Sequence, residues 1–94
     1  MIDCKNLQLT IDQIDDMRHA VGFEPEEMRK GQRHCKLFRN NFSTYGLSES
    51  WEDLISKGLA QRHEGIDNRI VYYFVSSDGL KALEYIFRVS MEES

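Results

Sequence analysis

The stretch "SKGLAQRHEGIDNRIVYYFVSSDG", residues 56–79, constrains the fold more than any other part of this 94-residue sequence. An apolar helical pattern ends at Lys57-Gly58, where a cation near the helix C-terminus and a glycine suited to a left-handed cap favour termination. Two strand-like segments follow, at residues 59–64 and 69–75, with the turn-forming sequence Gly-Ile-Asp-Asn at 65–68 between them. This order predicts a β-hairpin directly after a helix.

The second of these strands leads into another helix. Its sequence, IVYYFV, is apolar at both sets of alternating positions, so the strand needs packing on both faces. Ser76 is the expected N-cap of the next helix, and Gly79 is its third residue. Glycine lowers helix propensity there, and we therefore expect it to permit close approach to the hairpin. The helix has a wide apolar face, made up of Leu80, Ala82, Leu83, Ile86, Phe87 and Val89.

The first helix of the chain also has clear boundaries. Thr10 and Gln13 have the spacing of a capping box, and Gly22 is suited to a C-terminal stop. Together they predict a helix over about residues 10–21. Pro25 favours the first position of a further, short helix.

The helix that precedes the hairpin is predicted to begin after Ser48, a favourable N-cap. Its apolar residues fall on one face at helical spacing, and they are Trp51, Leu54, Ile55 and Leu59. We expect Trp51, and likewise Tyr72 in the second strand of the hairpin, to lie in the core because both occupy periodic apolar positions.

Other segments give weaker indications. Between residues 36 and 44, Phe38, Asn40 and Phe42 alternate with polar neighbours, which suggests a short strand that the two adjacent asparagines disfavour. Glu84 and Arg88 have the i, i+4 spacing of a solvent-side ion pair. From Met91 onward we expect a frayed tail, so the ordered part is predicted to span about residues 8–90.

Size and composition predict one domain over residues 1–94, and the predicted order of helices, hairpin and final helix makes its class α+β. A hydrophobic content of 40% is enough for a modest core and too high for a disordered chain. The sequence has neither a run long enough to span a membrane nor the pattern of a signal peptide, so we expect a cytoplasmic protein. Cys4 and Cys35 fit no paired-cysteine motif, and free thiols are therefore expected.

Charge is distributed unevenly along the chain. The net charge is -4, yet residues 28–48 contain no acidic residue. This segment holds five cations, which are Arg29, Lys30, Arg33, Lys36 and Arg39. We call residues 29–39 the basic segment. Its charge favours a polyanionic partner, although loop cations that pair with acids elsewhere would give the same pattern.

The back half of the sequence resembles winged helix-turn-helix regulators. The motif "W-x-x-L-x-x-x-G-L-A", a hairpin, and "F-V-S-x-x-G-x-x-A-L" follow one another from Trp51 to Leu83. The chain is also similar to a group of small phage and prophage proteins, through "M-R-H-A-V-G-F" from Met17, "F-R-N-N-F" from Phe38 and the Trp51 motif. These resemblances imply a winged-helix-like fold, a bacterial host cell and, for the first family, DNA binding. The second implies no activity.

In the usual winged-helix docking, the helix before the wing enters the major groove. Here that helix would carry Glu49, Glu52 and Asp53, which oppose binding to a polyanion. We therefore expect nucleic acid, DNA on the winged-helix precedent, to contact the basic segment and the wing instead. The predicted binding residues are Arg29, Lys30, Arg33, Lys36, Arg39, Asn40, Arg62 and Arg69. For the wing arginines, pairing with Glu64 or Asp67 is the alternative.

Other functions remain open at this point. A protein-binding adaptor or inhibitor is the main alternative, with exposed aromatic residues as anchors, and the apolar last helix would also suit a homodimer. No nucleotide-binding or hydrolase motif is present, so we predict no enzyme and no cofactor. His19, His34, His63, Cys4 and Cys35 lack ligand spacing, and no metal site is predicted.

Overall fold

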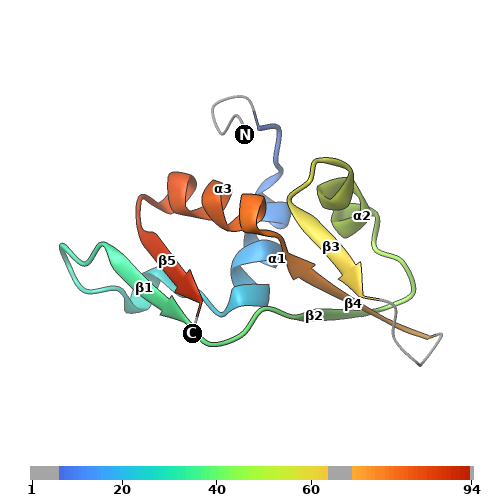
Figure 1. The fold of residues 1–94 in the computed structure, drawn as a ribbon, viewed down its shortest axis with the longest axis horizontal. Coiled ribbons are helices and arrows are strands. Elements are labelled where there is room, and N and C mark those ends of the chain that lie inside the picture. Colours follow the sequence, from blue (N-terminus) through green and yellow to red (C-terminus); the bar gives the residue numbers. More distant parts are fainter. Residues whose placement is uncertain (1–6, 64–68, 94) are drawn as a thin grey trace.

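The fold is α+β, as the sequence predicts. A computed structural model describes residues 7–63 and 69–93. In chain order the elements are α1 (Ile11–Val21), the 3-10 helix η2 (Pro25–Glu27), β1 (His34–Leu37), β2 (Phe42–Tyr45), α2 (Glu49–Ser56), β3 (Ala60–His63), β4 (Ile70–Val75), α3 (Ser77–Phe87) and β5 (Ser90–Glu93). The β1–β5 sheet and the β3–β4 hairpin lie toward opposite ends of the long axis, with α1 between them (Figure 1).

The predicted hairpin is confirmed, and it forms part of a three-stranded antiparallel sheet. Its order is β2-β4-β3, with Phe42 opposite Tyr73 and Ala60 opposite Val75. Strand β4 is therefore hydrogen-bonded along both edges. Tyr73 and Val75 are buried on one of its faces, whereas Ile70, Tyr72 and Phe74 on the other face are only partly buried, so the expected core position of Tyr72 is not reached. The predicted turn at residues 65–68 lies outside the described residues.

The second sheet departs from the sequence prediction. Strands β1 and β5 pair in parallel, with His34 opposite Ser90 and Leu37 opposite Glu93. The expected fraying from residue 91 is therefore wrong for residues 91–93, because pairing with β1 and burial of Met91 hold this segment in place. The single strand suggested over residues 36–44 is also absent, since two strands of different sheets flank an irregular stretch at 38–41.

The predicted helix ends are confirmed by their hydrogen bonds. Thr10 and Gln13 form a reciprocal capping box at 3.0 and 3.1 Å, and Gly22 ends α1 in the left-handed conformation. The hydroxyls of Ser48 and Ser76 accept hydrogen bonds from the third backbone N–H of α2 and α3. These contacts satisfy N–H groups that a helix start leaves without an intrahelical partner.

Helix α3 ends differently from the expected i, i+4 ion pair. Arg88 adopts a left-handed conformation (φ 56°), and the chain then turns into β5. The Glu84 carboxylate accepts a hydrogen bond of 2.8 Å from the Met91 backbone N–H. Glu84 therefore helps to fix the turn between α3 and β5.

The core lies between the three-stranded sheet and the helices. Trp51 is fully buried, as predicted, and its ring stacks on Tyr73 with 5.4 Å between the centroids. The buried hydrophobic residues are Met17, Ala20, Val21, Phe23, Leu37, Trp51, Leu54, Leu59, Ala60, Tyr73, Val75, Leu80, Ala82, Leu83 and Met91. Helices α1, α2 and α3 each contribute to this set, so the core joins these three helices to the sheets.

Gly79 permits the predicted close approach of α3 to the hairpin. A Cβ atom at this position would overlap the Leu59 carbonyl oxygen and lie 2.5 Å from Val75 Cγ1. The Ser76 N–H also donates to the Leu59 oxygen at 3.0 Å. The start of α3 is therefore held directly against the beginning of the hairpin.

Candidate nucleic-acid interface

The first part of the basic segment is a hydrogen-bonded turn. The Gln32 N–H donates to the Arg29 carbonyl at 2.9 Å, and the Gln32 side chain accepts from the Arg29 N–H and donates to the His34 carbonyl. Gly31 occupies the left-handed region (φ 84°) that this turn requires. Arg29, Lys30 and Arg33 are all exposed here. The turn thus presents three cations on a backbone fixed by Gln32.

Lys36, the next cation, is exposed because the side chains of β1 alternate between a buried and an exposed face. Cys35 is partly buried and Leu37 is buried, whereas His34 and Lys36 are exposed on the other face. Across the pair, the Ser90 N–H donates to the Arg33 carbonyl at 2.7 Å. Strand β5 therefore supports the backbone that carries these side chains.

Arg39 lies where the basic segment meets the end of α1. Its guanidinium donates a hydrogen bond of 2.8 Å to the His19 carbonyl, one of the carbonyls at the helix C-terminus. A cation is favourable at this end of a helix dipole. Arg39 also packs closely against Gly22. Its side chain is thus oriented by α1 while remaining exposed.

The five cations of the basic segment have no carboxylate partner within 4.0 Å among residues 7–63 and 69–93. The ion pairs in this part of the chain involve Arg18, Lys57 and Arg62. The His34 imidazole lies 3.2 Å from the Glu92 carboxylate and forms an ion pair only when it is protonated. Solvent-exposed cations that form no ion pair within the protein are available to neutralise the phosphates of a polyanion. This observation favours a polyanion-binding surface over a simple network of surface ion pairs.

Asn40 has a structural position rather than an exposed one. The register of β2 with β4 would place residue 40 opposite Val75, just beyond the last paired residues. The side-chain amide replaces the missing strand there, because it accepts from the Val75 N–H and donates to the Val75 carbonyl, both at 2.8 Å. Both functions of the amide are therefore used inside the fold.

We expect Asn40→Ala to lower the free energy of unfolding by about 2 kcal/mol, since it leaves two backbone groups of Val75 without these partners. Urea denaturation followed by circular dichroism measures this loss. Asn41→Ala is the matched control, because Asn41 is exposed and its backbone N–H keeps its bond to the Ala20 carbonyl. Equal stability of the two variants, with binding reduced only in Asn40→Ala, would instead indicate a direct contact.

The wing arginines are not adjacent to the basic segment. Arg62 lies on β3 and Arg69 immediately before β4, and this hairpin lies toward the opposite end of the molecule from β1 (Figure 1). Arg62 forms an ion pair of 2.7 Å with Glu52 on α2. The alternative partners expected for the wing arginines, Glu64 and Asp67, lie outside the described residues. The Tyr73 hydroxyl donates to the same carboxylate at 2.9 Å. The eight predicted residues therefore do not form one continuous surface.

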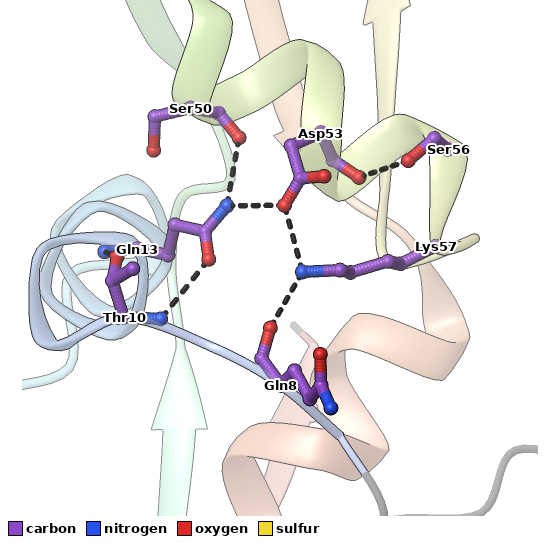
Figure 2. A network of polar contacts seen from close by, with 7 residues as sticks. All are labelled: Gln8, Thr10, Gln13, Ser50, Asp53, Ser56 and Lys57. Atoms are coloured by element: carbon purple, nitrogen blue, oxygen red, sulfur yellow. Dashed lines mark hydrogen bonds and ion pairs between the residues drawn. The ribbon is translucent and has the colours of Figure 1, made fainter.

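Two of the acidic residues of α2, Glu52 and Asp53, have structural partners as well. Figure 2 shows the Asp53 carboxylate between Gln13 of α1 and Lys57 at the end of α2. It accepts hydrogen bonds of 2.8 Å from Gln13 and 2.7 Å from Lys57. Lys57 also donates to the Gln8 carbonyl, and Gln13 to the Ser50 carbonyl. Lys57 and Gln13 lower the pKa of Asp53, so this carboxylate stabilises the fold at neutral pH and loses that effect as the pH falls through its lowered pKa.

No group of three or more potential metal ligands occurs within residues 7–63 and 69–93. Cys35 is a free thiol, as predicted, and burial raises its pKa, which lowers the fraction of reactive thiolate. Cys4 lies outside the described residues. No helix in the described part of the chain is long and apolar enough to cross a membrane.

One surface residue was not predicted as part of the interface. Phe38 follows β1, and 82% of its surface is exposed. It borders an open hollow of about 470 Å³ that Lys36 and Arg39 also line. The sequence offered one signal, an aromatic residue between two cations, but the alternation with Phe42 suggested a shared strand face instead. In comparisons with known proteins, no family model, curated protein or solved structure matches this chain.

Proposed function

We propose that this chain is a non-catalytic, winged-helix-like module of phage or prophage type that binds nucleic acid through its basic segment. The observation that carries this proposal is the set of five exposed cations without a carboxylate partner in the described residues. Phosphate neutralisation by such cations supplies much of the affinity in nucleic-acid binding. Arg33 and Lys36 are the central members of the set.

The winged-helix part of the proposal is supported by the order of elements around the hairpin. Helix α2 is followed by β3 and β4 and then by α3, which packs against the hairpin at Gly79. The preceding strand β2 pairs with β4. The arrangement differs from a helix-turn-helix in one respect: α1 ends at Val21, and η2, β1 and β2 separate it from α2.

Charge reversal tests the nucleic-acid proposal. We expect Arg33→Glu to weaken binding to a labelled oligonucleotide at least tenfold at low salt, because one phosphate contact is replaced by repulsion. Fluorescence anisotropy over a salt series measures this, and the slope of log K against log salt should fall by about one. Lys81→Glu is the matched control, since it makes the same change in net charge at an exposed position of α3.

The contrary result is equally clear. If the unmodified protein binds no single-stranded or duplex oligonucleotide at low salt, the nucleic-acid proposal is wrong. Equal losses of oligonucleotide affinity in Arg33→Glu and Lys81→Glu would also contradict it, because affinity would then depend on net charge and not on the position of the cation in the basic segment.

Protein binding is the second candidate function, and two exposed side chains favour it. Tyr45, the last residue of β2, is 89% exposed, and Leu47, between β2 and α2, is 66% exposed. An exposed aromatic and aliphatic pair is typical of an anchor in a protein interface. Co-purification from cells tests this candidate: it is supported if a protein stays bound after nuclease treatment and is lost in Tyr45→Ser with Leu47→Ser.

A further inference from the structure

Phe38 is exposed at a place where the surrounding surface is both concave and cationic. The strand alternation buries Leu37, and the chain then leaves β1 with the Phe38 ring directed away from the core. A single exposed aromatic residue is ordinary on a protein surface. Here, however, the ring borders a hollow lined by Val21, Gly22, Glu24, Lys36, Phe38 and Arg39.

The charged groups of this hollow favour an anionic ligand. Lys36 and Arg39 have no carboxylate partner in the described residues, whereas Glu24 accepts a hydrogen bond of 3.0 Å from Arg18. Arg18 is shared between Glu24 and Asp15, with which it also pairs at 3.5 Å. The hollow itself is lined by two cations, one carboxylate and an exposed aromatic ring.

Arg39 is held in place before any ligand binds. One of its nitrogens donates to the His19 carbonyl at 2.8 Å, and its side chain packs on Gly22. A guanidinium has five N–H groups, so an oriented arginine can bind a phosphate without losing the bond that positions it. This pre-organisation reduces the entropy that binding would cost.

We propose that this hollow binds an unpaired nucleotide of a single-stranded nucleic acid. The base stacks on Phe38, the flanking phosphates contact Lys36 and Arg39, and the strand continues along the turn that carries Arg29 and Arg33. Stacking on an aromatic ring together with backbone neutralisation is how single strands are bound without sequence preference. This inference deepens the proposed nucleic-acid function and rests on it.

The geometry favours a single strand over a duplex for two reasons. In a duplex, neighbouring bases cover both faces of each base, so an aromatic ring at the protein surface reaches only unpaired or extruded bases. In addition, α2, which would enter the major groove in the usual docking, has Glu49 exposed and carries Glu52 and Asp53. Neither feature hinders a single strand that lies along the basic segment at the other end of the molecule.

The test compares a labelled 12-nucleotide oligothymidine with the same strand in a duplex and with a strand whose bases are replaced by abasic spacers. By anisotropy at low salt, the single strand is expected to bind at least tenfold more tightly than the duplex. Phe38→Ala is expected to lose roughly 5- to 150-fold in affinity for the single strand, and Phe38→Tyr to retain it. Comparing the affinity for oligothymidine with that for an oligouridine strand shows whether the protein prefers DNA or RNA.

The abasic strand makes the test specific to stacking. It is expected to bind the unmodified protein more weakly than oligothymidine, and to bind Phe38→Ala and the unmodified protein equally, because the ring then has no base to contact. Arg33→Glu should weaken the abasic and the normal strand alike. Circular dichroism checks that Phe38→Ala is folded, as expected for a side chain that is 82% exposed.

Two results would overturn the inference in distinguishable ways. Equal binding of duplex and single strand, with no effect of Phe38→Ala, would reject the stacking site while leaving the nucleic-acid function of the basic segment in place. Absence of binding to any of the oligonucleotides at low salt would reject both.

Discussion

Gly79→Ala is expected to destabilise the domain by at least about 3 kcal/mol, although alanine is the better helix former. Helix propensity alone would favour alanine by about 1 kcal/mol. The added Cβ would overlap the Leu59 carbonyl oxygen and approach Val75 Cγ1 to 2.5 Å. Since the oxygen belongs to the backbone at the start of the hairpin, relief requires moving α3 away from the sheet.

Urea denaturation followed by circular dichroism measures this effect. Lys81→Ala is the control, because it places alanine at an exposed position of the same helix, where a change within about 0.5 kcal/mol is expected. A Gly79→Ala variant as stable as Lys81→Ala would mean that α3 does not lie against Leu59 in this way.

Trp51→Ala is expected to lower the free energy of unfolding by about 3–5 kcal/mol. The Trp51 ring is fully buried, stacks on Tyr73 and lies 5.3 Å from the Phe42 ring by centroids. It therefore joins α2 to two strands of the central sheet, and its removal leaves a cavity that neighbouring side chains fill only in part. Trp51→Phe keeps an aromatic ring and should lose less.

The measurement again uses circular dichroism, because Trp51 is the single tryptophan and both variants lose its fluorescence. Tyr85→Ala serves as control, since it removes an aromatic ring that is half exposed on α3. A loss in Trp51→Ala no larger than in Tyr85→Ala would contradict the buried position.

The parts of the fold that could be predicted depend on short-range chemistry. Capping by Thr10, Ser48 and Ser76 involves residues three positions apart, and Gly22 and Gly58 occupy left-handed conformations that other residues disfavour. Such contacts depend on only a few consecutive residues and can therefore be predicted from the sequence. The hairpin could be predicted for the same reason, because its two strands lie next to each other in sequence.

The β1–β5 sheet could not be predicted, because its strands are joined by long-range pairing. Residues 34 and 90 are far apart in the sequence, and each strand is only four residues long, too short for an alternating pattern to be distinctive. The structural role of Asn40 could not be predicted for the same reason, since its partner is distant in the sequence. Its amide is matched to Val75, and only the register of the sheet reveals that partner.

For the candidate interface, the sequence identified the charges but not their placement. The absence of acids from residues 28–48 pointed correctly to a group of exposed cations. It could not reveal that Arg62 pairs with Glu52 across α2 and β3, far from this group. Nor could it separate Phe38 from Phe42, since the break between the two sheets falls between them.

The parallel pairing of β1 with β5 has a practical consequence for any binding assay. Strand β5 is the one strand that pairs with β1 in the described part of the chain, and the Ser90 N–H donates a hydrogen bond to the Arg33 carbonyl. Proteolysis or a fusion within residues 90–93 would therefore remove this support from the backbone that carries Arg33 and Lys36. Preparations for binding work should therefore be checked by intact mass, so that a damaged end is not mistaken for a weak ligand.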